Sequence, residues 1–263
     1  MTILSFLFVF ILGLITGSFL NVLVLRYHSG QTIGGRSHCL SCGKTLAWYE
    51  LLPVISFLVQ RGRCLGCQSK ISWQYPLVEL LTGLLFVLAY LQFSADGWLS
   101  LAFYLVIISL FVAITVYDLR HKIIPDLFVW LVGILALLRP ILLSNFDNKI
   151  GNLWSDYQMV ILGGLAAGGI FLLLWLMSRG QWLGFGDVKL ALVVGFLLGP
   201  IQVFSALILA VWLGAVVGLI LVILTKTGLF GFKKYFTIKS ELPFAPFIIL
   251  GVVLNLFFQV NVF

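Results

Sequence analysis

The sequence predicts an all-α polytopic membrane protein with about eight transmembrane helices and a small cytoplasmic zinc-knuckle loop. Of its 263 residues, 62% are hydrophobic and 10% are charged, whereas soluble domains average about 25% charged residues. The mean hydropathy is +1.15. All four cysteines fall in one polar loop as two C-x-x-C pairs. These observations exclude an ordinary soluble globular domain.

Seven apolar segments have the length that a membrane-spanning helix requires. An eighth segment reaches that length only when Asp187 and Lys189 are counted inside it. The predicted spans are approximately 3–25, 76–93, 98–117, 127–143, 157–177, 182–199, 201–224 and 242–263. The first span lacks a basic segment before it and a small-residue cleavage site after it, so we expect a retained helix.

The distribution of basic residues decides whether 182–199 crosses the membrane. With eight crossings and the N-terminus outside, Arg139 and Lys149 lie outside and the other fourteen of sixteen Lys and Arg lie on the cytoplasmic side. Without that crossing, four lysines between 226 and 239 move outside and the split falls to ten against six. The positive-inside rule therefore favours eight crossings. Because the net charge of +7 is spread over short loops, it indicates contact with the lipid bilayer and no nucleic-acid partner.

These spans suggest two regions. Residues 1–96 hold the first two membrane helices and a cytoplasmic loop at 26–75, and residues 97–263 hold six helices. Glycine pairs within the spans predict close helix packing. Ser18 and Asn21 in the first span are expected to form hydrogen bonds to a neighbouring helix. The glycine pairs are Gly163-Gly164 with Gly168-Gly169, and Gly214 with Gly218. The segment 144–156 is predicted to be a solvated outer loop.

The cysteine loop predicts a structural metal site. Cys39 and Cys42 form one knuckle and Cys64 and Cys67 the other, with twenty-one residues between them. Two such turns supply the four thiolates that zinc accepts, and a set of four protein ligands leaves no position for a catalytic water. A reducing cytoplasm disfavours the alternative of two disulfides. His38 is an alternative ligand. Gly43 and Gly66 suit tight knuckle turns, and the short apolar run at 51–59 is expected to lie against the membrane or pack on the knuckles.

Two carboxylates at the ends of apolar runs are the candidate catalytic residues. Asp118 closes one span, and Asp187 lies between Gly184 and Gly186 on one side and Lys189 on the other. A charge at membrane depth costs roughly 2.5–3.5 kcal/mol on insertion scales, so it persists where it is paired, hydrated or used. Two carboxylates at one level favour acid–base chemistry, and the two glycines leave room for a substrate backbone.

Structural roles are the alternatives for these acids. Asp187 could be the N-cap of the next helix, and Asp118 could pair with Arg120 or Lys122. We expect Asp126, after Pro125, to stabilise a first helical turn, and Lys189 to be a snorkelling anchor that could also tune the two acids. Glu79, inside the second span, could contact a substrate amino terminus or pair with Arg26, and the sequence leaves both open.

Six motifs, in order along nearly the whole chain, resemble those of the bacterial type IV prepilin leader peptidases, membrane aspartic proteases of the Gly-x-Gly-Asp type. They are GSFLNV at 17–22 with Arg26, the two C-x-x-C knuckles, ISWQYPLVELL at 71–81, the Asp118-Leu119 and Ile124-Pro125-Asp126 run, GFGDVK at 184–189, and PFAPF at 243–247. The chain departs from the family pattern at Tyr27-His28, where Leu-Pro is often found, and at Ala245, which replaces the usual glycine.

This resemblance implies that Asp118 and Asp187 are the catalytic pair, that the four cysteines hold zinc, that the substrates are pilin-like precursors, and that the membrane is the bacterial inner membrane. It also implies methylation of the new amino terminus with S-adenosylmethionine, for which 26–75 shows no glycine-rich nucleotide loop. Two alternatives stand beside this hypothesis. One is a protease with unrelated membrane substrates, and the other is a non-enzymatic transporter or assembly scaffold with a structural zinc module.

Overall fold

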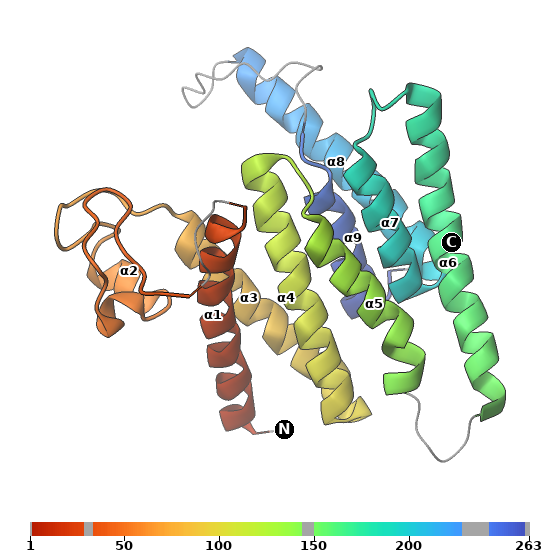
Figure 1. Ribbon diagram of the computed structural model, residues 1–263, viewed down its shortest axis with the longest axis horizontal. Helices are drawn as coiled ribbons and strands as arrows, with labels where there is room; N and C mark the ends of the chain where they lie inside the picture. Colours follow the sequence, from red (N-terminus) through yellow and green to blue (C-terminus); the bar gives the residue numbers. More distant parts are fainter. Residues whose placement is uncertain (1, 29–33, 144–149, 228–241, 261–263) are drawn as a thin grey trace. The chain divides into compact units, whose positions relative to one another are not determined.

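The computed structural model describes residues 2–28, 34–143, 150–227 and 242–260 (Figure 1). The regular secondary structure of this part of the chain is helical apart from two isolated β-bridges, and turns and irregular segments connect the helices. It divides into two compact units, Met1–Val116 and Tyr117–Phe263. Four of the lysines counted in the positive-inside distribution lie outside the described residues: Lys149, Lys233, Lys234 and Lys239. The outer loop predicted at 144–156 is only partly described.

The first unit contains two long helices, a loop that carries the cysteines, and most of a third helix. Its elements are α1 (Ile3–Arg26), the 3-10 turn η1 (Trp48–Leu51), α2 (Ile55–Val59), α3 (Gln74–Phe93), η2 (Ser94–Asp96) and α4 (Trp98–His121). The second unit begins near the end of α4. It contains α5 (Asp126–Leu142), α6 (Ile150–Ser178), α7 (Phe185–Leu198), α8 (Pro200–Thr227) and α9 (Ala245–Phe258).

Every predicted span contains a helix, but lengths differ from the prediction. Within the described residues, α1, α3, α4, α6 and α8 are long and apolar enough to cross a membrane. The helices α5, α7 and α9 have 17, 14 and 14 residues. The prediction of a loop up to residue 156 was wrong, because α6 already begins at Ile150. Helix α9 ends at Phe258, before the predicted limit.

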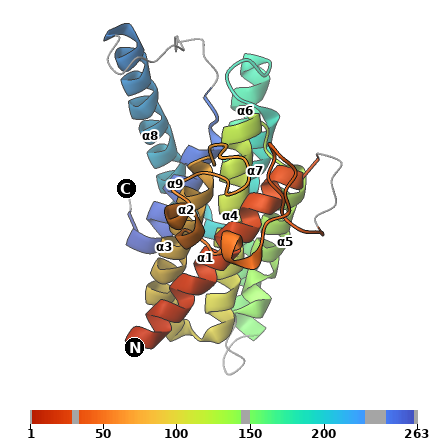
Figure 2. The same ribbon diagram turned by 90° about the vertical axis from the view of Figure 1, so that its left-hand side faces the viewer.

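In the first unit, α1 packs across α3 with their backbones in contact (Figure 2). A Cβ atom on Gly17 would lie 2.8 Å from the Glu79 Cα, which explains why a glycine stands there. The predicted hydrogen bonders are confirmed: Asn21 Nδ2 donates to the Tyr75 carbonyl at 3.2 Å, and Ser18 hydrogen-bonds Glu79. These bonds satisfy the Asn21 amide N–H and the Ser18 hydroxyl, which would otherwise be costly between apolar helices, whereas Asn21 Oδ1 is buried without a partner among the described residues.

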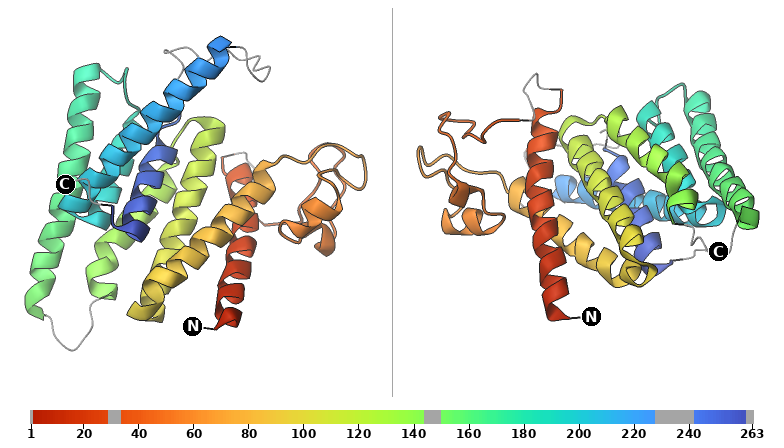
Figure 3. Two further views of the ribbon diagram at one scale, coloured as in Figure 1. Left: turned by 180° about the vertical axis from the view of Figure 1, so that it is seen from behind. Right: turned by 60° about the horizontal axis from the view of Figure 1, so that its bottom comes forward.

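Glu79 ties the cysteine loop to the membrane helices. Its Oε2 atom accepts a 2.7 Å hydrogen bond from the backbone N–H of Val54, which lies in the loop. The guanidinium of Arg26 donates instead to the carbonyls of Gly34 and Arg36, at 3.0 and 3.3 Å. The loop therefore attaches beside α1 at two levels, and it lies beside the C-terminal half of α1 in each view of Figures 1 and 3.

Helix α7 is the centre of the second unit. It contacts α5, α6, α8 and α9, and Leu190, Ala191, Val193 and Val194 have no exposed surface. Such a helix is apolar all round, as a core helix should be. Because its 14 residues give only about 21 Å of helix, its position depends on these neighbours.

Glycines let α6 and α7 meet backbone to backbone. A Cβ atom on Gly163 would lie 2.7 Å from the Gly199 Cα and would collide with the Gly195 carbonyl oxygen. A Cβ atom on Gly168 would lie 2.8 Å from the Leu192 side chain, whereas Gly169 faces open space. The prediction of close packing is therefore confirmed for this seam, with Gly169 outside it.

The prediction for Gly214 and Gly218 was wrong. Cβ atoms there would make ordinary contacts of 3.5 and 3.7 Å, with Phe247 and Leu242. The close approach in that part of the unit occurs at Gly251 of α9, where a Cβ atom would collide with the Ala206 carbonyl oxygen of α8. The glycine spacing in α8 therefore did not reveal that the close contact between α8 and α9 depends on a glycine of α9.

Polar contacts tie α7 to α5 at both ends. Near the start of α7, Lys189 Nζ forms an ion pair with Asp126 at the start of α5, at 2.8 and 2.9 Å to the two carboxylate oxygens. Near the end of α7, Arg139 Nη1 donates to the Leu197 carbonyl at 2.9 Å, which satisfies one of the unpaired terminal carbonyls. Rotation or sliding of α7 along α5 would break both contacts.

The α6–α7 seam gives a first prediction. The change Gly163→Ala places a methyl group against a backbone that cannot move aside, so it should lower the free energy of unfolding by about 1–3 kcal/mol. Gly169→Ala on the same helix is the matched control, and it should be neutral or slightly stabilising because alanine favours helix. Thermal unfolding of both purified variants in detergent measures the difference. Equal unfolding midpoints for the two variants would contradict the packing described.

Candidate active site and metal centre

Asp187 lies in the first turn of α7, with its carboxylate folded back onto the start of the helix. Gly184 is the residue before the helix, and its N–H donates to Asp187 Oδ2 at 3.2 Å. The Asp187 N–H in turn donates to the Gly184 carbonyl at 3.1 Å. Asp187 is therefore not the N-cap residue itself; it satisfies a free N–H from the third helical position, in a place where the helix dipole favours a negative charge.

The two glycines before Asp187 have different roles. A Cβ atom on Gly184 would lie 3.4 Å from Asp187 Oδ2 and would touch no other described residue, so this glycine keeps the space over the carboxylate open. A Cβ atom on Gly186 would lie 3.0 Å from the Ile124 Cβ. The expectation that both glycines leave room for a substrate was wrong for Gly186, because Ile124 of the same chain occupies that space.

Asp118 lies in the last turn of α4 and is 4% exposed. Its carboxylate accepts a hydrogen bond from the N–H of Ala245, the first residue of α9. Its Oδ2 atom is buried and has no hydrogen-bond partner among the described residues. A buried carboxylate oxygen without a partner is costly, which makes it a candidate for a reacting group or for a site that a water or substrate completes.

The alternative reading of Asp118 as half of a surface ion pair was wrong. The ion pairs found between described residues join Lys44 to Glu50 and Lys189 to Asp126. Arg120 and Lys122 are exposed, in contrast to Asp118. The backbone link between Asp118 and Lys122, a 2.7 Å hydrogen bond from N–H to carbonyl, only extends the end of α4.

The fold brings Asp118 and Asp187 close enough for their charges to interact. The two residues are sixty-nine positions apart in the chain, and each carboxylate accepts an N–H from the start of a helix, α9 for Asp118 and α7 for Asp187. Asp187 is 8% exposed. Two such acids, whose like negative charges repel each other and which are largely shielded from water, can hold a single proton between them.

Two residues beside this pair were missed or misread from the sequence. Ala245 supplies its N–H to Asp118, and the motif at 243–247 pointed to the segment without revealing this role. For Lys189 the sequence missed the partner, because its ammonium pairs with Asp126 and lies 5.3 Å from the Phe185 ring centre. Asp126 does open α5, as predicted. The helical spacing of Asp187 and Lys189 could not reveal a partner sixty-three residues away.

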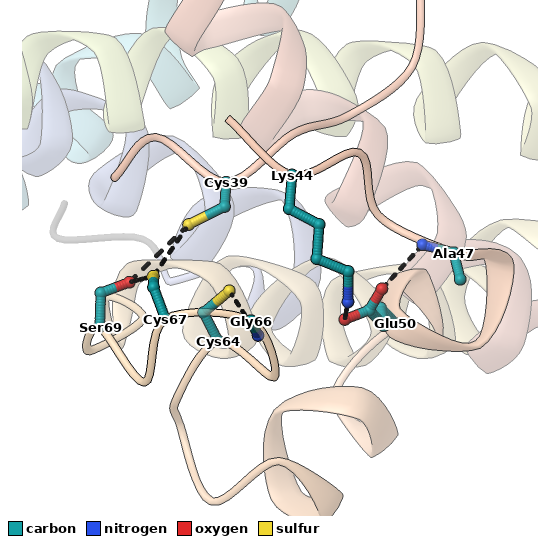
Figure 4. A network of polar contacts seen from close by, with 8 residues as sticks. All are labelled: Cys39, Lys44, Ala47, Glu50, Cys64, Gly66, Cys67 and Ser69. Atoms are coloured by element: carbon teal, nitrogen blue, oxygen red, sulfur yellow. Dashed lines mark hydrogen bonds and ion pairs between the residues drawn. The ribbon is translucent and has the colours of Figure 1, made fainter. Parts of the chain in front are cut away.

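The four cysteines meet at one point of the loop, as Figure 4 shows for three of them. Their four sulfur atoms all lie within 4.8 Å of one another, and Cys39 Sγ lies 3.8 Å from Cys67 Sγ. Tetrahedral zinc with Zn–S bonds of about 2.3 Å places its sulfurs roughly 3.8 Å apart. The cluster therefore fits a metal ion, and His38, which is exposed and bridges to Thr45, is not part of it.

The two knuckles have the same backbone design. In each, the first cysteine donates its N–H to a carbonyl five residues later at 2.9 Å and accepts an N–H from four residues later at 2.9 Å. The latter residues are Gly43 and Gln68, both with positive φ (72° and 57°). The expectation for Gly43 is confirmed. The second knuckle uses Gln68 at this position, whereas Gly66 allows close approach, since its Cβ atom would lie 3.1 Å from Lys44.

The loop favours thiolates at some of these positions. Hydrogen bonds from the N–H groups of Cys42 and Ser41 lower the pKa of Cys39 to about 6, and the Ser69 hydroxyl lowers the pKa of Cys67. The Lys44 N–H lowers the pKa of Cys42. The hydrogen bond with Cys67, desolvation and the neighbouring Cys39 thiol outweigh this effect and raise the pKa of Cys42 to about 11. The thiols therefore do not ionise independently, as expected for groups this close.

An ion pair closes the loop next to the first knuckle (Figure 4). Lys44 Nζ lies 3.0 Å from Glu50 Oε1, and the Ala47 N–H donates to Glu50 Oε2 at 2.8 Å. The Ala47 N–H and then the Lys44 ammonium hold the pKa of the buried Glu50 carboxyl below its usual range, and Glu50 raises the pKa of Lys44. Behind it, Phe57 packs on Trp73 with ring centres 4.8 Å apart, which gives the loop a small core of its own.

Comparison with known proteins places this arrangement in a family. The model for "Bacterial Peptidase A24 N-terminal domain" matches residues 11–93, and that for "Type IV leader peptidase family" matches residues 104–223. A prepilin leader peptidase/N-methyltransferase of Bacillus subtilis is 35% identical over 253 residues, which cover 95% of this chain and 92% of that protein. A type 4 prepilin-like proteins leader peptide-processing enzyme of Escherichia coli is 32% identical over 270 residues, covering 94% and 91%.

A third relative, a prepilin leader peptidase/N-methyltransferase of Myxococcus xanthus, is 38% identical over 226 residues. That match covers 83% of this chain and 63% of the longer relative, so the chain spans somewhat less than two thirds of it. No solved structure matches the chain. Because the relatives align along nearly its whole length and the family models cover both halves, the chain belongs to the bacterial type IV leader peptidase family.

Proposed function

We propose that this chain is a membrane aspartic endopeptidase that removes the leader peptide of type IV pilin-like precursors. The observation that carries the proposal is the pair formed by Asp118 and Asp187, two largely buried carboxylates whose charges interact and which are both held by helix N-termini. Family membership supplies the substrate class. A structural scaffold would not require two interacting carboxylates, one of which has a buried oxygen without a partner among the described residues. A transporter site is expected near the bilayer midplane, whereas these acids follow or precede apolar runs.

The chemistry needs no nucleophilic side chain. With one proton between the two carboxyl groups, the ionised carboxylate takes a proton from a water molecule while the protonated one donates to the scissile carbonyl oxygen. The water oxygen bonds to the carbonyl carbon, and the resulting tetrahedral intermediate breaks its C–N bond as the amine nitrogen receives a proton. The N–H groups of Ala245 and Gly184 hold the two carboxylates in place throughout. The two acids are protonated and deprotonated as a coupled pair, so the shared proton belongs to the pair rather than to either residue.

We propose eight crossings with the N-terminus outside, so that α5, α7 and α9 cross together with the five longer helices. The short α7 is surrounded by α5, α6, α8 and α9, and its own apolar surface therefore need not match the bilayer thickness. In this orientation Asp118, Asp187 and the cysteine loop all lie at the cytoplasmic side. The enzyme would then cut just cytoplasmic of a substrate's own apolar helix, after a short basic leader held inside.

We further propose that zinc occupies the cysteine cluster as a structural ion and that the new amino terminus is methylated with S-adenosylmethionine. Cys39, Cys42, Cys64 and Cys67 would hold the zinc, which would lock the two knuckles together without an open position for chemistry. The methylation rests on the names of the relatives, which are peptidase/N-methyltransferases.

Cleavage of a pilin-like precursor tests the proposed function. When the precursor and this chain are expressed together, the product's N-terminal sequence should begin directly after a small residue, at the cytoplasmic end of the precursor's apolar helix. Asp187→Asn should abolish the product while the protein still inserts in the membrane. Asp96→Asn changes an exposed acid and should leave cleavage intact. Cleavage on the outer side of the precursor helix, or an active Asp187→Asn variant, would refute the proposal.

Zinc content tests the metal site separately from activity. The purified protein should contain one zinc per chain, and Cys42→Ser should lose it because three thiolates no longer close the tetrahedral site. Ser41→Ala, on the same knuckle, should keep the metal. Elemental analysis gives the stoichiometry, and far-UV circular dichroism should show that the membrane helices of the Cys42→Ser variant remain folded. Native protein without zinc, or with a mass that indicates disulfides, would argue against a zinc site.

A further inference from the structure

We propose that the cysteine loop is partly immersed in the lipid bilayer and that the outward face of α2 rests among the acyl chains of the leaflet beside it. This face consists of Ile55, Leu58 and Val59, and we call it the α2 face. The proposed function enters only in naming the leaflet as cytoplasmic. The immersion itself requires only that α1 crosses the membrane.

Apart from Ser56, the side chains of α2 are apolar and unsuited to water. The α2 face is 57%, 65% and 77% exposed at its three residues. These residues are spaced i, i+3 and i+4, so they lie on one side of the helix. Phe57 lies on the opposite side and is buried against Trp73. A short helix that packs one face inward normally presents polar residues outward, and one that is apolar all round belongs in a core or a membrane.

Contacts within the first unit place α2 at membrane depth. Val54, the residue directly before α2, donates its N–H to Glu79, and the Glu79 backbone touches Gly17 of α1. Gly17 precedes Arg26, the end of α1, by nine residues, which is about 13 Å along the helix axis. The 24 residues of α1 measure about 36 Å, and a hydrocarbon core about 30 Å thick ends roughly 3 Å before Arg26.

The Glu79 side chain tilts toward the start of α3 and so toward this boundary, which places Val54 roughly 5–10 Å inside the hydrocarbon. The second contact between the loop and α1, at Arg26, gives the depth of the other end of the loop. The Arg26 guanidinium holds the carbonyl of Arg36, so the loop leaves α1 at the membrane boundary. Interfacial helices typically bury their apolar faces about 5–10 Å into the headgroup and acyl boundary. The loop therefore runs from the boundary at Arg36 down to a depth at which Ile55, Leu58 and Val59 meet lipid.

The charge of the loop is complementary to anionic lipid headgroups. Residues 34–73 contain five Lys or Arg and one acid, Glu50, which is buried and paired. Even when a zinc ion on four thiolates contributes −2, the balance remains +2. Arg61 and Arg63 are exposed and closely follow α2, and Lys70, after the second knuckle, is exposed too. Juxtamembrane basic residues are attracted to anionic leaflets. The same positive charge disfavours the basic leader of a precursor as the occupant of the α2 face.

Quenching by brominated lipid measures the proposed depth. An environment-sensitive fluorescent amino acid replaces Leu58 in one variant of the full-length, zinc-loaded protein and Arg36 in another. Each variant is reconstituted in phosphatidylcholine and phosphatidylglycerol vesicles, with or without bromine on the acyl chains. We expect bromine to reduce emission roughly twofold at position 58, because an interfacial helix buries its apolar face in the acyl region. Position 36 should change little and should instead be quenched by aqueous iodide.

Zinc content and precursor cleavage show whether each labelled variant is folded, and labelling at Val59 replaces position 58 if that variant fails. Insensitivity of position 58 to brominated chains in folded protein would overturn the proposal, whether iodide reaches it or a second copy of the chain shields it. This test is independent of the peptidase assignment. A protein that cleaves precursors but shows no quenching at position 58 would refute the immersion alone.

Discussion

The contact between the backbones of α6 and α7 is the constraint on which the candidate active site depends. Helix α7 carries Asp187 in its first turn but has only 14 residues, so it cannot rely on its own length to fix its height in the membrane. Gly163 and Gly195 let the two backbones touch, and Gly199 ends α7 in a conformation (φ 78°) that side chains disfavour. The ion pair with Asp126 and the Arg139 hydrogen bond then hold α7 against α5.

Helix starts stabilise both acids of the candidate site. Asp187 accepts the N–H of Gly184, and Asp118 accepts the N–H of Ala245 at the start of α9. The positive end of a helix dipole lowers the cost of a buried negative charge, and each acid keeps an oxygen for other partners. The arrangement brings together three segments that are far apart in the sequence. The segments that lead into α7 and α9 are rich in glycine or proline, and these residues fix the position at which each helix begins.

The sequence alone predicted the helices, because long apolar runs and their punctuation by Gly, Pro and charged residues are local signals. It also pointed to Asp118 and Asp187 and to the four cysteines, because ionisable groups in apolar runs and paired C-x-x-C spacings stand out. It could not reveal which partner a side chain finds across space. Lys189 pairs with Asp126, and Glu79 holds a loop N–H, through contacts set by tertiary packing. The role of Gly186 against Ile124 was hidden for the same reason.

The central claim is that Asp118 and Asp187 act as one unit, and the most direct test is a double-variant cycle of cleavage rates. The rates compared are those of wild type, Asp118→Asn, Asp187→Asn and the double variant, on one precursor and at equal enzyme levels. If the two acids share a single task, each single variant should lose roughly 10³-fold or more in kcat and the double variant little beyond that. Losses that multiply in the double variant, or a single variant that keeps most of its activity, would contradict the account.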